Sequence, residues 1–234
     1  MTAILTLTRY RKSHIFFALS AMGLFRPFLW LNKKFSFYRL LGCGRNGSFD
    51  IYPDWNQYAI FSLIERNEYH ANEFRHNYML WKRRYYGKFI SSWWRFFGVE
   101  TWTIVLHPVM SHGKWGGKEI VADTSTTTNG DQIAVLTRAS IRLNKAREFW
   151  KNVPSVEKQM SKAQGLIFSI GIGEFPVLRQ ATFSIWKDME SMKAFAYNMQ
   201  QHKDVIRKTR DDNWYSEELF ARFVILDERR EGRR

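Results

Sequence analysis

An internal repeat constrains the fold of this chain more than any other feature of its sequence. Four short segments of the first half recur in the second half in the same order, and the shift between partners drifts only from 129 to 120 positions. Such order and small drift indicate a duplicated structural unit. The four pairs are Thr8-Arg9 with Thr137-Arg138, 42–44 with 171–173, 59–62 with 181–184, and 104–106 with 224–226.

Each half follows the order strand, helix, strand, strand, helix, strand. A helix is predicted over 145–162, with a break at Pro154, and a second helix begins at Asp188, a good N-cap residue. This order is that of the ferredoxin-like split unit. In the second half, alternating and β-branched apolar runs predict strands over 132–141, 165–172, 179–186 and 219–226.

Two such units in tandem, βαββαβ twice, predict an α+β fold. A four-stranded sheet of this kind leaves one face uncovered by helices, and packing the two bare faces together gives one two-sheet α/β barrel. We therefore expect an N-terminal ferredoxin-like half over 1–112 and a C-terminal ferredoxin-like half over 131–234. The segment 113–130, rich in Gly, Thr, Ser and Asn, is the expected linker.

The net charge of +14 is concentrated in the first half. Residues 1–120 hold 17 Lys and Arg against 7 Asp and Glu, and the stretch 81–97, WKRRYYGKFISSWWRFF, interleaves cations with aromatic rings. Three interpretations are open for 81–97: a helix with aromatic rings towards the core and cations towards water, a peripheral contact with an anionic membrane, or a nucleic-acid surface. We prefer the first two and expect no nucleic-acid partner.

Possible targeting segments and the cysteine content indicate the cellular compartment of the protein. The apolar run 15–25 behind the basic segment 9–12 resembles a secretory signal, but it has about half the length that crosses a bilayer, and Arg26-Pro27 interrupts it. We therefore assign it to the fold. The single cysteine, Cys43, excludes an internal disulfide and fits a reducing compartment. The expected location is cytoplasmic, with peripheral contact to the inner membrane face as an extension of it.

His202 stands out among the six histidines. The familiar phosphate-loop, dinucleotide, zinc-protease and nucleophile-elbow patterns are missing from the sequence. In the helix that begins at Asp188, Met192, Phe195 and Met199 form an inward apolar stripe, and His202 continues it at the same spacing. A neutral imidazole that points into an apolar cavity suits a proximal heme ligand. The alternative is a core histidine bonded to a backbone carbonyl.

The repeat gives His202 no counterpart in the first half. At the corresponding position of the first half the chain has Leu80. A cofactor in the barrel should therefore bind once, in the second half.

Several segments are long and specific enough to suggest a family. Asp54-Trp55, before the strand at Tyr58, adds a match in the first half to those of the second. The second-half segments are GIGEFPVLRQATFSIW at 171–186, RDDNWYSEELFARF at 210–223, LTRASIR at 136–142, and Phe149-Trp150 followed by Val153-Pro154. Together they resemble the spheroidene monooxygenase family, most strongly over 130–226 and more thinly, but collinearly, through the first half.

The resemblance implies a heme-dependent monooxygenase that introduces a keto group at C-2 of acyclic carotenoids such as spheroidene. Members use heme b, molecular oxygen and electrons from a ferredoxin-type donor. Two oxidations of one carbon give a gem-diol that collapses to the ketone. His202 occupies the matching histidine position and is the expected ligand of the iron. The basic and aromatic first half departs from the family pattern, which leaves the substrate more open than the cofactor.

Four further residues are expected to line the cofactor. Met199 and Phe195 belong to the same helical stripe as His202. Phe183 and Trp186 lie at odd spacing on one strand, so they cannot both face the cavity.

Arg138 is the expected catalytic residue. It follows the first strand of the second half and would meet a heme propionate or bound oxygen, although its twin Arg9 keeps a structural role open. Trp214 and Arg222 also lie in matching segments, with packing as the alternative to function. Glu174 is a candidate carboxylate at the cavity mouth, or simply a turn residue.

Two other classes of function stay open. One is a different heme reaction on the same barrel, such as aldoxime dehydration, which needs no external oxygen. The other is a non-enzymatic barrel that binds carotenoid or lipid, which predicts no heme. A requirement for oxygen and a reductant separates the first from the monooxygenase.

Overall fold

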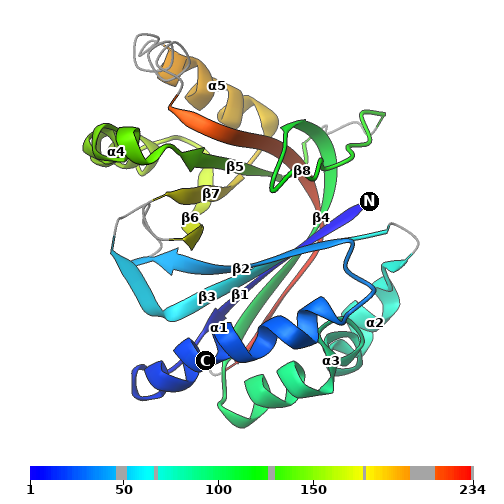
Figure 1. Cartoon of the computed structure of the whole chain (residues 1–234). Coiled ribbons are helices and arrows are strands. Elements are labelled where there is room, and N and C mark those ends of the chain that lie inside the picture. Colours follow the sequence, from blue (N-terminus) through cyan, green and yellow to red (C-terminus); the bar gives the residue numbers. More distant parts are fainter. Residues whose placement is uncertain (46–51, 66–67, 126–129, 176–177, 201–213, 233–234) are drawn as a thin grey trace. The chain divides into compact units, whose positions relative to one another are not determined.

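The structure is a computed structural model, and it describes residues 1–45, 52–65, 68–125, 130–175, 178–200 and 214–232 (Figure 1). The side chains of Phe175 and of 198–200 are also outside the described set. The first half of the chain forms β1 (Thr2–Arg9), α1 (Ile15–Trp30), β2 (Phe37–Gly44), β3 (Pro53–Ile64), α2 (Ala71–His76), α3 (Tyr78–Phe96) and β4 (Glu100–Gly113). The second half forms β5 (Ile133–Ile141), α4 (Ala146–Met160), β6 (Leu166–Phe175), β7 (Arg179–Trp186), α5 (Met189–Gln200) and β8 (Tyr215–Glu231).

The order of strands confirms the repeat. In hydrogen-bonding order the strands follow β1-β3-β2-β6-β7-β5-β8-β4 and close into one barrel. The first four strands of the chain thus have the order β4-β1-β3-β2, and the last four have the matching order β8-β5-β7-β6. The described pairings around β1 and β5 are antiparallel. The predicted α+β class of two ferredoxin-like units in an α/β barrel is therefore correct.

The chain also divides into two compact units. Unit 1 comprises 1–42, 54–106 and 226–234, and unit 2 comprises 43–53 and 107–225. The last part of β8 thus belongs to unit 1, whereas its first part belongs to unit 2. The predicted division into 1–112, 113–130 and 131–234 stays a prediction.

Unit 1 has an aromatic core between its sheet and its helices. Trp81, Tyr85, Tyr86 and Trp94 of α3 are buried against apolar side chains of β1 and β3. The hydroxyl of Tyr86 lies 2.6 Å from that of Thr6 on β1, so the buried phenol has a polar partner. For the first half of α3, the core interpretation of 81–97 is therefore correct for the aromatic rings, whereas Lys82 is buried and pairs with Glu231 instead of facing water.

The second half of α3 has a mixed character. Gly87 adopts a positive φ of 79° inside the helix, which divides α3 at a residue where only glycine is unstrained. Beyond it, Ile90 and Trp94 are buried while Phe89 and Phe96 are exposed. No helix among the described residues combines the length and apolarity that a bilayer span requires.

Unit 2 separates two sets of side chains onto the two faces of its sheet. Because side chains alternate along a strand, Ile133 and Val135 of β5 lie on the face towards α5, and Leu136 and Arg138 lie on the other face. The predicted β7, 179–186, matches the observed strand, and β5 matches within one residue.

Pro154 does not break the fourth helix. The predicted break is wrong, because α4 continues from Ala146 to Met160 with Pro154 inside it. Pro154 is exposed, so the helix loses one backbone hydrogen bond on its hydrated side and continues.

Candidate functional site

An apolar layer between α5 and the sheet of unit 2 is the candidate site. We call it the α5 layer. Figure 1 shows α5 packed along one face of the sheet of unit 2. Phe195 packs on Trp186 with ring centroids 5.1 Å apart, and Met192 is buried beside them. The predicted inward stripe of α5 is therefore correct for Met192 and Phe195. The layer consists of Ile133, Val135, Met160, Ala163, Leu166, Trp186, Met189, Met192, Phe195, Phe220 and Val224.

The start of α5 is fixed by a cap and a close contact. The Asp188 carboxylate accepts a hydrogen bond from the Ser191 amide at 2.8 Å, as the sequence predicts, and this bond lowers the pKa of Asp188. Gly165, just before β6, has a φ of 78° and packs directly on Ser191. A Cβ at 165 would overlap the Ser191 side chain, so both the positive φ and this close contact require glycine there.

Arg222 places a cation within the α5 layer. It alternates with Phe220 and Val224 on β8 and pairs with Val135 of β5, so it shares their face of the sheet. Its Nε is buried and has no hydrogen-bond partner among the described residues. Burial lowers the pKa of the Arg222 guanidinium. A guanidinium in this setting favours an anionic partner, above all a carboxylate.

Phe183 lies on the other face of the sheet from Trp186. It is fully buried and pairs with Leu136 of β5 and Ile170 of β6. The structure thus resolves the odd spacing of these two residues: Trp186 lies in the α5 layer with Phe195, and Phe183 does not.

Arg138 shares the face of Phe183 and is part of a buried ion cluster. Its guanidinium donates to the carboxylate of Glu217 and lies 3.7 Å from that of Glu174. Glu217 also accepts the amides of Gly116 and Gly117, each at 2.9 Å. Burial opposes ionisation, but these amides and Arg138 together hold the pKa of Glu217 below its usual range.

The Arg138 cluster has a second carboxylate with several contacts. Glu174 accepts a hydrogen bond from the indole of Trp115 and lies 3.8 Å from Arg179. The guanidinium of Arg138 lies over the Trp115 ring, 5.8 Å from its centroid. Trp115 is buried, which ties the segment after β4 to this cluster.

The central prediction of the sequence lies outside the described residues. His202 is in the segment 201–213, and the side chain of Met199 is likewise not described. Among the residues that the structure does describe, no group of three His, Cys, Asp or Glu side chains is placed to hold a metal ion. The iron ligand therefore stays a prediction.

Relatives of known name match this chain over most of its length. The spheroidene monooxygenase of Rhodobacter capsulatus is 36% identical over 230 residues, which covers 96% of this chain and 90% of the relative. The chain belongs to the spheroidene monooxygenase family. The spheroidene monooxygenase of Rubrivivax gelatinosus is 32% identical over 192 residues, covering 81% of this chain and 68% of the relative. No protein-family model matches the chain.

A solved structure shares the fold of this spheroidene monooxygenase family member. An aldoxime dehydratase in complex with butyraldoxime aligns with a TM-score of 0.57, covering 97% of this chain and 79% of that one. The sequence identity is 11%, so the likeness shows the fold alone.

Membership in the spheroidene monooxygenase family makes the chain an oxidoreductase of the monooxygenase class. Within it, the structure brings Trp186, Phe195 and Met192 together and keeps Phe183 and Arg138 on the opposite sheet face. Sequence reasoning left Arg222 without a role. The available signal was its place between Phe220 and Val224, where alternation calls for an inward apolar residue.

Proposed function

We propose that this family member is a heme-dependent monooxygenase that introduces a keto group at C-2 of acyclic carotenoids such as spheroidene. The substrate class rests on the name of relatives that match nearly the whole chain. The observation that carries the cofactor is the α5 layer, an apolar and aromatic layer that contains Arg222, whose Nε has no hydrogen-bond partner among the described residues.

The α5 layer fits heme b in its chemistry. The porphyrin is a flat apolar ring, and the α5 layer holds Trp186 and Phe195, aromatic side chains that pack on one another here and belong to the type that packs on such a ring. The propionates of heme are carboxylates, and Arg222 offers the cation that such a group requires in an apolar layer. When bound, heme supplies the iron chemistry that activates oxygen.

His202 is the proposed ligand of the heme iron. Met192 and Phe195 define the side of α5 that packs on the sheet, and Met199 and His202 follow at the same spacing. A neutral imidazole is a common axial ligand of heme iron. His202 would then hold the iron, and the apolar side chains of the α5 layer would contact the ring.

Arg138 is the proposed catalytic residue. Glu217 and Glu174 fix its guanidinium, while its Nε has no hydrogen-bond partner among the described residues. The Nε–H is therefore the group that it retains to donate towards substrate or oxygen. Arg138 lies on the sheet face opposite the α5 layer. This role therefore requires the reacting group to reach the face of Arg138.

The proposed reaction takes two rounds. In each round one atom of O2 enters a C–H bond at C-2, and the other leaves as water with two electrons and two protons. The electrons come from a ferredoxin-type donor. The gem-diol that results loses water to give the ketone, so the protein has to position one carbon twice and exclude bulk water.

An absorption spectrum tests the cofactor. The wild-type protein, expressed with ample heme, should show a Soret band at roughly 400–420 nm, and His202→Ala should lose or shift it. His112→Ala is the matched control, because His112 is an exposed histidine of the same unit. A folded wild type with no band would refute the heme proposal, and a band unchanged in His202→Ala would move the ligand elsewhere.

Turnover of spheroidene separates the proposed reaction from its rivals. Ketone should form only when oxygen and a reduced ferredoxin-type donor are both present. Turnover of an aldoxime without oxygen would favour a dehydratase instead. Retention of carotenoid with no heme and no product would favour a binding barrel.

A further inference from the structure

Helix α1 is apolar on most sides, yet one of its sides is covered by none of the described residues of unit 1. Its 16 residues include one charged side chain, Arg26. Ala18, Ala21, Phe25 and Leu29 pack inward on the core. A helix of this kind is normally buried all round, either in a protein core or in lipid.

The outward side of α1 continues onto α3. The Phe28 ring stacks on Phe89 with centroids 4.3 Å apart, and the Phe17 ring stacks on Phe97 at 4.5 Å. Both helices lie on one side of unit 1 (Figure 1). The stacked rings therefore form a continuous apolar seam between the two helices, and further exposed apolar residues of α1 flank it. We define the α1–α3 face by six exposed residues: Phe16 (73% exposed), Leu24 (46%), Phe28 (43%), Trp30 (76%), Phe89 (37%) and Phe96 (82%).

Cations without acidic neighbours in the sequence surround this face. The chain has no Asp or Glu before Asp50, and none between Glu73 and Glu100. A cavity of about 390 Å³ is lined by Arg11, Arg95 and Phe96, and it also contains Glu231, which pairs with the buried Lys82. The exposed cations beside the face are Arg11, Lys12, Arg26, Lys88 and Arg95.

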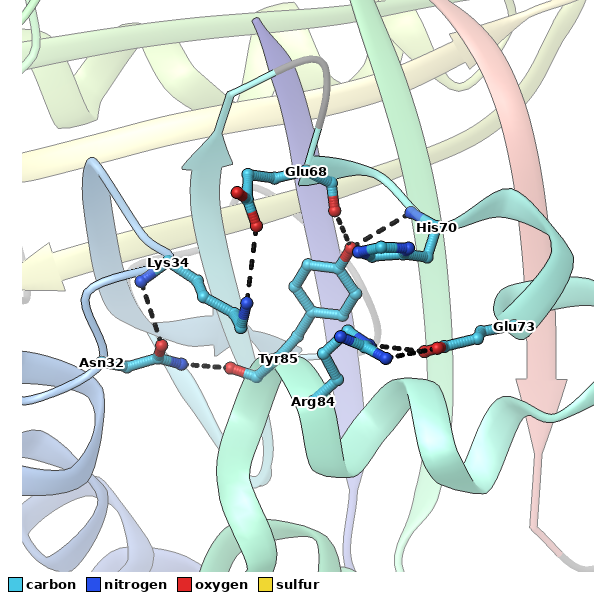
Figure 2. A network of polar contacts seen from close by, with 7 residues as sticks. All are labelled: Asn32, Lys34, Glu68, His70, Glu73, Arg84 and Tyr85. Carbon is cyan, nitrogen blue, oxygen red and sulfur yellow. Dashed lines mark hydrogen bonds and ion pairs between the residues drawn. The ribbon is translucent and has the colours of Figure 1, made fainter.

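Polar contacts hold α1 and α3 in place beneath the face. The Asn32 side chain, just after α1, donates to the carbonyl of Tyr85 on α3 (Figure 2). The Tyr85 hydroxyl in turn bonds to the backbone of Glu68 and His70, and Arg84 pairs with Glu73 of α2. Since the surface is already ordered, docking it on a partner requires little further ordering of the backbone.

We propose that the α1–α3 face docks on the surface of an anionic lipid bilayer. Exposed Phe and Trp side chains would enter the headgroup and upper acyl region, and the surrounding Lys and Arg would contact lipid phosphates. The 16-residue α1, with Arg26 and Pro27 near its end, is suited to lie in the interface rather than to cross it. The proposal depends on unit 1 alone and not on heme.

Sedimentation with vesicles tests this surface. Wild-type protein should bind vesicles of phosphatidylcholine with phosphatidylglycerol, bind phosphatidylcholine alone more weakly, and release in high salt. The variant Phe16→Ser/Trp30→Ser/Phe96→Ser should bind the anionic vesicles at least about tenfold more weakly. Its matched control is Val121→Ser/Leu143→Ser/Tyr197→Ser, which removes three apolar residues of comparable exposure from unit 2 and should bind as wild type.

A charge variant separates the electrostatic part from the apolar part. Each cation removed in Lys12→Gln/Arg26→Gln/Lys88→Gln should weaken binding to anionic vesicles about fivefold, with little change on phosphatidylcholine.

Three results would overturn the proposal. The first is wild-type protein that stays in the supernatant with both kinds of vesicle. The second is equal binding by the aromatic variant and its control. The third is a wild-type dimer in light scattering that the aromatic variant alone abolishes, without vesicle binding, since the face would then join two copies of the chain. All substituted residues are exposed, so thermal unfolding should stay close to wild type and exclude misfolding as the cause.

Discussion

Two arginines at corresponding positions of the repeat have opposite surroundings. Arg9 ends β1 with half of its side chain exposed, and lies 3.7 Å from Asp54. Arg138, its twin on β5, is 4% exposed between Glu217 and Glu174. The alignment of the halves locates both residues correctly. The alignment does not reveal that Arg138 is buried and Arg9 is not, because the segment after β4 brings Trp115 beside Arg138 only.

The twins should differ in their contribution to stability. Arg138→Gln removes the buried cation that Glu217 and Glu174 share, although Glu174 keeps Arg179 at 3.8 Å, and should lower the free energy of unfolding by about 3–5 kcal/mol. Arg9→Gln, the matched control, removes a pair whose cation is half exposed and should lower it by less than about 1 kcal/mol. Urea titrations of both variants measure the difference. Equal losses would show that Arg138 is not held by its carboxylates.

The pH dependence of the Arg138 effect has a definite sign. The folded state lowers the pKa of Glu217, so Glu217 stabilises the fold above its ordinary pKa of about 4.3, and this contribution disappears as the pH falls through the lower folded value. The penalty of Arg138→Gln should therefore be largest near neutral pH and shrink in acid. A penalty that grows in acid would contradict the assignment.

Arg222 should affect the apo-protein and the loaded protein in opposite directions. Arg222→Met removes a cation whose Nε has no hydrogen-bond partner among the described residues, so the heme-free protein should become more stable by about 1 kcal/mol. The same variant should bind heme about tenfold or more weakly, because the carboxylate loses its partner. Arg142→Met, an exposed arginine in the same unit, should change neither quantity.

Two measurements distinguish these effects of Arg222. Urea unfolding of the heme-free proteins gives the stability, and heme titration followed in the Soret region gives the affinity. A less stable apo-protein would mean that Arg222 has a structural anionic partner. Unchanged heme affinity with a more stable apo-protein would leave the heme proposal intact and remove Arg222 from it.

At the scale of elements, periodicity predicts most helices and strands but not what covers them. The strand 179–186 and the start of α5 at Asp188 follow from alternation and capping. The run 15–25 is apolar without periodicity, so its sequence predicts a buried segment and gives no sign of which side stays exposed. The predicted break of α4 at Pro154 is wrong for a related reason, since only the structure shows that Pro154 lies on the hydrated side.

The contact between the start of β6 and the start of α5 should be sensitive to a single methyl group. Gly165→Ala combines a positive φ with overlap on Ser191, so the free energy of unfolding should fall by about 2–4 kcal/mol. Gly130 has the same φ of 78° with open space around it, so Gly130→Ala isolates the backbone strain and should lose only about 1–2 kcal/mol.

A double variant checks the origin of the Gly165 effect. Ser191→Gly removes the overlapping side chain and should recover part of the loss in Gly165→Ala, as thermal unfolding would show. If the stability loss of the double variant equals the sum of the losses in Gly165→Ala and Ser191→Gly, the Gly165–Ser191 contact does not decide the position of α5.

At the scale of the whole molecule, the repeat predicts the strand order of both halves. Two copies of one unit must build two sheets of the same order, and β4-β1-β3-β2 and β8-β5-β7-β6 agree. The candidate site is less predictable, because it depends on which sheet face a helix covers. Phe183 and Trp186 belong to one strand, yet the packing of α5 selects Trp186. The proposed ligand, His202, stays a prediction.

The discontinuity of unit 1 has a consequence for synthesis on the ribosome. Its segment 226–234 follows all of unit 2 in the chain, and supplies Asp227 to Arg75 and Glu231 to Lys82, across separations of 152 and 149 residues. Contacts of such sequence separation form late in folding. The nascent chain therefore carries α1 and its exposed rings for most of translation before unit 1 is complete. A membrane surface near the ribosome would cover those rings during that interval, whereas the last part of β8 leaves them exposed even when unit 1 is complete.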